Sequence, residues 1–195
     1  MTCPELGAPA TGLLAAAVGY ALRAAGPATP ELMSCPTPCR GWDLRTLLRH
    51  GAESLAALRE GITAGRVGLH AGPESAEVLA DPAAEFRTRA VALLGACDGA
   101  AGRDSLISVA GRCLPLSLAA GVGALEIAVH GWDISRACGP REPIPGPLAT
   151  RLLEIGPLLV PRDGRDPLFA APVTVGPCGG LSDQLAAWLG RDPAA

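Results

Sequence analysis

Residues 114–135 constrain the fold most, because this stretch is long, apolar and rich in alanine and glycine, yet it contains three ionisable side chains. These are Glu126, His130 and Asp133. The stretch is typical of a buried helix, which we predict over residues 116–138. Buried charges are costly unless they are paired or bind a metal ion, so these three side chains indicate a special environment.

The spacing of the three ionisable residues indicates a shared site. At about 100° per residue, Glu126, His130 and Asp133 fall within one narrow sector of the helix. Small residues continue this sector and leave space beside the polar groups, namely Ala119, Gly123 and Ala137. An apolar stripe lies next to it, formed by Leu118, Val122, Leu125 and Val129. A glutamate and a histidine four residues apart can bind one ion from a single helix.

A metal site of this kind needs a further ligand from another part of the chain. The chain has only three histidines. His70 lies in a glycine-flanked loop, which we interpret as exposed, whereas His50 lies at the edge of the apolar stripe of a predicted second helix. His50, Glu126 and His130 would form a three-ligand set with an open coordination position, which is typical of catalytic sites.

The same residues allow a plainer interpretation, in which Glu126 and His130 only hydrogen-bond to each other and His50 is an ordinary half-buried histidine. Asp133 either orients a ligand histidine from behind or pairs with Arg136, three residues further on. Trp42 and Trp132 are interpreted as packing residues.

The cysteines favour reduced thiols over disulfides. There are seven of them, scattered along the chain, and the N-terminus lacks the basic start of a signal peptide. Cys35 and Cys39 could be metal ligands or a redox pair, but one pair without a second is weak evidence, and we favour two small thiols in a proline-rich turn. We therefore expect a cytoplasmic protein.

Composition excludes several classes of protein. A chain of 195 residues suits one domain with room for a small appendage, and only 3% of it is aromatic, so the core must consist of aliphatic residues. The net charge is −3, with no basic stripe and no lysine, which argues against a nucleic-acid partner. The uncharged runs do not indicate a membrane span.

The pattern predicts four long helices followed by a smaller mixed region. Besides residues 116–138, helices are expected at 8–26, from Asp43 to Gly61 or Gly65, and from Asp81 to Cys97, with a loop at 66–75. Residues 105–109 have an extended character. The remainder contains expected helices at 148–160 and 181–190, and an extended segment at 172–175 that could pair as a strand with 105–109. We expect a bundle over 1–140 that holds the metal site, with 141–195 as an extension packed on it.

Two segments resemble the signatures of the mycothiol-dependent maleylpyruvate isomerase family. The first runs from Thr37 to Leu44 and continues through Leu47-Leu48-Arg49-His50, and the second is Glu126-Ile127-Ala128-Val129-His130-Gly131-Trp132-Asp133. The closing residues 189–193 are similar to the end of many actinobacterial members. The resemblance implies a DinB-like four-helix bundle. It also implies that His50, Glu126 and His130 are the metal ligands, the same three that spacing indicates.

The resemblance leaves the reaction open. It implies a divalent metal ion, with zinc as the leading candidate, and mycothiol as a cosubstrate. The leading hypothesis is a thiol-dependent transferase or isomerase that acts on a small electrophile. The extension over 141–195 is short for this family, and no mycothiol-binding residue can be matched. A thiol-independent metal-dependent hydrolase, lyase or cyclase is the second hypothesis, and a non-catalytic ligand-binding or sensing module is the third. Either a monomer or a homodimer is compatible with the sequence.

Overall fold

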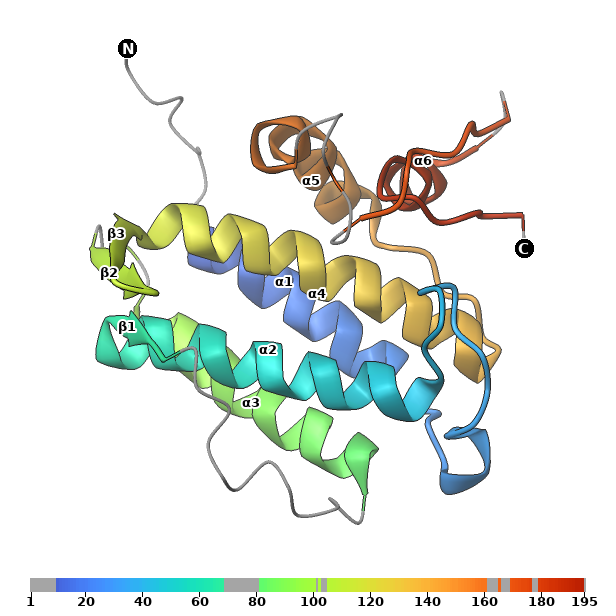
Figure 1. Ribbon diagram of the computed structural model, residues 1–195, viewed down its shortest axis with the longest axis horizontal. Coiled ribbons are helices and arrows are strands. Elements are labelled where there is room, and N and C mark those ends of the chain that lie inside the picture. The colour runs from blue at the N-terminus through green and yellow to red at the C-terminus, as the bar shows by residue number, and fades with distance from the viewer. Residues whose placement is uncertain are drawn as a thin grey trace.

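The protein is a bundle of four long helices with a smaller helical region beside it (Figure 1). The computed structural model describes residues 10–68, 81–100, 102, 105–160, 165, 169–176 and 179–194. The bundle consists of α1 (Ala10–Ala24), α2 (Leu44–Ala64), α3 (Pro82–Gly99) and α4 (Leu116–Cys138), with the short helix η1 (Pro30–Leu32) between α1 and α2. Helices α5 (Gly146–Leu159) and α6 (Leu181–Trp188) both contact α4. The expected mainly helical bundle with a small extension is confirmed.

A small sheet marks one end of the bundle. It contains β1 (Arg66–Val67), β2 (Leu106–Val109) and β3 (Arg112–Pro115), in that order. Helix α2 ends just before β1 and α3 leads to β2, whereas α4 begins directly after β3. Helix α4 therefore runs antiparallel to α2 and α3, as Figure 1 shows.

The helix boundaries follow from local capping groups. The Asp43 carboxylate accepts a hydrogen bond of 2.8 Å from the Thr46 amide at the start of α2, and Asp81 accepts two from the first turn of α3. Gly65 and Gly139 end α2 and α4 with φ angles of 68° and 98°, which glycine adopts without strain. These four boundaries agree with the sequence predictions.

Two predictions about extended segments are wrong. Residues 66–67 form β1, not part of a loop, and Arg66 pairs in parallel with Ser108 of β2. Residues 172–175 do not form a strand; the Val173 amide instead donates a hydrogen bond of 2.9 Å to the carbonyl of Ala187, against the end of α6. Besides β1, strand β2 pairs with β3, and β3 was not predicted.

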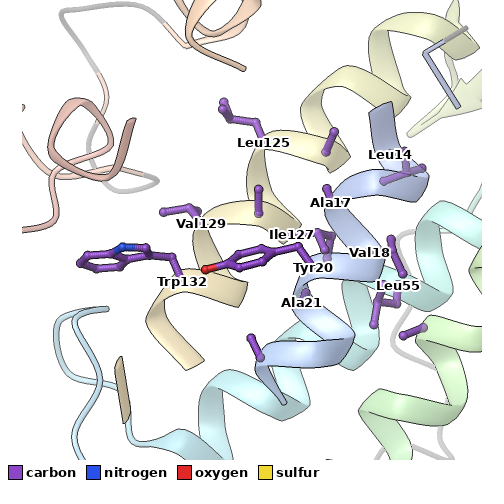
Figure 2. Close-up of a cluster of buried hydrophobic side chains, with 14 of the residues drawn as sticks. Leu14, Ala17, Val18, Tyr20, Ala21, Leu55, Leu125, Ile127, Val129 and Trp132 are labelled. Atoms are coloured by element: carbon purple, nitrogen blue, oxygen red, sulfur yellow. The ribbon is translucent and has the colours of Figure 1, made fainter. Parts of the chain in front are cut away.

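Helices α1 and α4 approach each other closely at Gly131. A Cβ atom at this position would lie 3.0 Å from the Cα of Ala21, so only a glycine allows the two backbones to come this near. Figure 2 shows Tyr20 and Ala21 on α1 facing α4 at this level, with Trp132 beyond them. The Tyr20 hydroxyl donates a hydrogen bond of 2.8 Å to the carbonyl of Glu142, which ties the chain after α4 to α1.

The apolar stripe expected on α4 is only partly buried. Leu125 and Val129 are 1% exposed, but Leu118 and Val122 are 42% and 45% exposed. The end of α4 near the sheet therefore presents apolar side chains to solvent. Among the described residues, no helix combines the length and the apolar character needed to cross a membrane.

Candidate metal centre

The antiparallel packing of α2 and α4 brings the three predicted ligands together. His50 lies in the second turn of α2, and Glu126 and His130 lie one turn apart on α4. One donor atom from each of these side chains lies within 4.8 Å of the donor atoms of the other two. The rings of His50 and His130 meet edge to face, with centroids 5.2 Å apart. The spacing on α4 thus aims both of its polar groups at α2.

Glu126 is at the middle of a short hydrogen-bond network. Its Oε1 atom lies 3.1 Å from Nε2 of His50 and accepts a hydrogen bond of 2.6 Å from the hydroxyl of Ser54. Burial raises the pKa of this carboxyl group, but the hydrogen bonds from His50 and Ser54 and the nearby imidazoles outweigh burial, so the net pKa is lowered. Glu126 is therefore a carboxylate at neutral pH, which is the form that binds cations.

Asp133 lies behind His130, away from Glu126. Its Oδ2 atom is 3.2 Å from Nδ1 of His130, and the carboxylate is fully buried. A carboxylate in this position accepts a hydrogen bond from Nδ1–H, and this tautomer leaves the lone pair of Nε2 free for a ligand role.

The partner of Asp133 is Arg191, not Arg136. The Arg191 guanidinium donates from Nη2 to Oδ2 at 3.0 Å and from Nε to Oδ1 at 3.3 Å. Arg136 instead donates to the carbonyl of Pro193 and lies over the ring of Trp132. The alternative pairing of Asp133 with Arg136 is therefore wrong.

Trp42 covers both histidines. Its ring centroid lies 4.8 Å from that of His50 and 6.0 Å from that of His130, which it faces nearly in parallel. This half-buried side chain limits the positions that both imidazoles can adopt, whereas Trp132 is buried as a packing residue. The interpretation of Trp42 as a packing residue misses this contact with the site.

A second cluster shares His130 with the first. A donor atom of Cys39 lies within 4.8 Å of donor atoms of His130 and Asp133. Both carboxylate oxygens of Asp133 already accept hydrogen bonds from Arg191, and burial raises the pKa of the Cys39 thiol, so it keeps its proton. The set of His50, Glu126 and His130 therefore fits a cation better. Cys35 is half-buried as a free thiol.

The donor chemistry of this set fits a divalent transition metal. Two imidazoles and one carboxylate are a set that zinc accepts with a coordination position left open. The side chains of His50 and Glu126 are 37% and 30% exposed, whereas that of His130 is 10% exposed, so a small molecule can approach the site over His50 and Glu126. His70 lies outside the described residues.

Besides Trp42, two residues of the site have no counterpart among the predicted site residues. Ser54 lies one turn after His50 on α2, and this spacing could have indicated it. Arg191 is separated from Asp133 by 58 positions in the sequence, and only its place in the closing segment 189–193 could have pointed to it.

The fold and the clustered donors define a class, that of helical bundles with a candidate metal site between two antiparallel helices. The model of one family, described as "mycothiol maleylpyruvate isomerase N-terminal domain", matches residues 14–135. This match covers more than half of the chain, so the chain belongs to that family, as the two sequence signatures predicted. No curated protein and no solved structure matches the chain.

Proposed function

We propose that this protein is a metal-dependent enzyme that joins a low-molecular-weight thiol, such as mycothiol, to an electrophilic small molecule, or isomerises that molecule through such an adduct. The observation that carries the proposal is the cluster of His50, Glu126 and His130, whose donor atoms lie within 4.8 Å of one another in a chain of this family. The family description names mycothiol, and the open ligand set suits a sulfur ligand.

His50, Glu126 and His130 would hold the ion. A divalent metal bound there would supply Lewis acidity, which favours the thiolate form of a thiol near neutral pH. Asp133 keeps the proton on Nδ1 of His130, and Arg191 holds Asp133 in place. Ser54 fixes Glu126 by donating to Oε1. Trp42 keeps the two imidazoles in their relative orientation.

The reaction begins when the thiolate sulfur attacks an electrophilic carbon. With an activated double bond, a carbon–sulfur bond forms while the π electrons move to the conjugated carbonyl group. A transferase would complete the reaction by protonation of the adjacent carbon. An isomerase would allow rotation about the former double bond, after which the carbon–sulfur bond breaks and the thiolate leaves.

The test measures how fast the metal-loaded protein converts a fluorogenic bimane electrophile into its thiol adduct. The rate is compared in the presence of mycothiol, in the presence of glutathione and without any thiol. We expect adduct formation above the background rate with at least one thiol. A Glu126→Gln variant should lose this activity, and Glu53→Gln, at an exposed position on α2, should retain it.

Other results would select the other hypotheses. Turnover of electrophiles that continues without any thiol would select a metal-dependent hydrolase, lyase or cyclase. Metal binding without binding of thiols, and without reaction of electrophiles, would contradict the thiol-dependent proposal and favour a non-catalytic module.

A further inference from the structure

An apolar cavity lies beside the candidate metal centre. It has a volume of about 280 Å³ and lies between α2 and α4, with the small sheet at its far end. Glu126 and Ser54 line it at the end near the histidines. This volume is close to the lower end of the range of about 300–1,000 Å³ that is usual for small-molecule sites.

Small residues on both helices line the cavity. Ala57 and Gly61 line it from α2, and Ala119 and Gly123 line it from α4. A Cβ atom at Gly123 would lie 2.5 Å from Cδ2 of Leu58, so any larger residue would force that side chain to move. Gly123 thus lets the Leu58 side chain of α2 pack directly against the backbone of α4 at the cavity wall.

The lining of the cavity is apolar except at the end near the histidines. Among the described residues that line the cavity, Glu126 is charged, Ser54 carries a hydroxyl group, and all others are apolar. Val122 lines the wall and is 45% exposed, so the cavity opens to solvent. A ligand that fills it needs an apolar body, because a polar body would lose its hydration without gaining hydrogen bonds.

We infer that this cavity binds the body of the substrate, and that the substrate class is an electrophile with an extended hydrophobic chain and a polar reactive head. This inference rests on the proposed function, because the head would lie beside Glu126, where the proposed ion would be held. A small dicarboxylic acid does not fit this description. Its second carboxylate would meet apolar walls, and no cationic side chain is found among the described lining residues.

Two series of probes test the inference. The first is butanol, hexanol and octanol, which are titrated into metal-free protein. The second is the hydroxamic acids of the same chain lengths, whose head groups bind metals, titrated into metal-loaded protein. In both series we expect the affinity to rise about threefold to fourfold per added methylene, which corresponds to ~0.8 kcal/mol.

A cavity-filling pair of variants locates the binding. Ala119→Phe and Ala57→Phe place an aromatic ring in the cavity from opposite walls, and either one should abolish the dependence on chain length. Ala92→Phe, at an exposed position on α3 outside the cavity, should leave it unchanged. Thermal unfolding of each variant shows which ones keep the native fold. Because the two substitutions lie on opposite walls, the test still works if one of the two variants does not fold.

The outcomes separate this inference from the proposed function. If hydroxamates bind only when metal is present, but with an affinity that does not depend on chain length, the hydrophobic substrate class is overturned. The proposed metal-dependent enzyme would not be affected by that result. If the protein cannot be loaded with a metal ion at all, alkanol binding that rises with chain length would show only an apolar cavity, and would overturn both the proposed function and this substrate class. Alkanol affinity that falls as protein concentration rises would identify a second copy of the chain as the occupant, and would also overturn the inference.

Discussion

Nη2 of Arg191 lies 3.0 Å from Oδ2 of Asp133, and this contact joins the end of the chain to the candidate metal centre. The same carboxylate oxygen lies 3.2 Å from Nδ1 of His130. The orientation of one predicted ligand therefore depends on a cation that follows α6, outside the four-helix bundle. The extension thus stabilises the site as well as covering part of α4.

Replacing Arg191 with methionine should destabilise the protein strongly. The side chains of Arg191 and Asp133 are 7% and 0% exposed, so the variant would leave a buried carboxylate without its cation. We expect a loss of about 3–5 kcal/mol in the free energy of unfolding, measured by denaturant titration. Arg23→Met, at an exposed position on α1, should change it by less than ~0.5 kcal/mol. Equal effects of the two substitutions would contradict the role of this ion pair.

Replacing Ser54 with alanine should weaken metal binding and affect folding little. The hydroxyl of Ser54 donates a hydrogen bond of 2.6 Å to Glu126, and groups that orient a metal ligand typically contribute about tenfold or more to affinity. Competition with a chromophoric chelator measures this change. Thr63→Ala is the matched control, since its hydroxyl bonds only within α2. An unchanged affinity in Ser54→Ala would mean that Glu126 needs no support from α2.

Alanine substitutions at two helix glycines should have opposite effects. At Gly131 the new Cβ would lie 3.0 Å from the Cα of Ala21, which is backbone, so α1 and α4 must separate, at a cost of about 1–3 kcal/mol. At Gly95, within α3, nothing lies within 4 Å, and the better helix propensity of alanine should stabilise the protein by up to about 1 kcal/mol. Differential scanning calorimetry compares the two. A stabilising Gly131→Ala would refute the close packing of α1 and α4.

Stability should fall at alkaline pH because of Tyr20. Burial raises the pKa of this phenol well above its ordinary value, with the charge of Glu142 as a further cause. In the unfolded chain it ionises near pH 10, so its contribution is fully present below that pH and is lost as the pH rises further.

The composition of the chain makes this effect measurable. Tyr20 is the only tyrosine, and there is no lysine. Absorbance at the tyrosinate band should therefore stay low in the native protein until it unfolds. Tyr20→Phe should cost about 1 kcal/mol at neutral pH through the lost hydrogen bond to Glu142, and should make the alkaline decline shallower. Reversible ionisation near pH 10 without unfolding would contradict the burial of this phenol.

The features that the sequence predicts well depend on residues close together along the chain. Asp43, Asp81 and Gly139 cap helices through contacts within one turn, so their types and spacing suffice. The features that it predicts poorly depend on distant partners. The pairing of Arg66 with Ser108 is an example, and the β2–β3 turn contains Ala110 at a φ of 51°, a residue type that gives no turn signal.

The same distinction applies to the candidate site. Glu126 and His130 are one turn apart, and helical spacing alone places them on one face. His50 is assigned from its position on an apolar stripe and from the family signature, and the structure brings it to 3.1 Å from Glu126. The contact of Arg191 with Asp133 depends on how the extension packs against α4, and no local pattern in the sequence indicates this packing.

The most direct test of the central claim is the metal stoichiometry of the purified protein, measured by equilibrium dialysis against zinc and elemental analysis. We predict about one ion per chain in the wild-type protein and in Glu53→Gln, and a large loss in each of His50→Ala, Glu126→Gln and His130→Ala. A wild-type protein that binds no divalent ion, or three variants that all retain it, would contradict a metal centre at these residues.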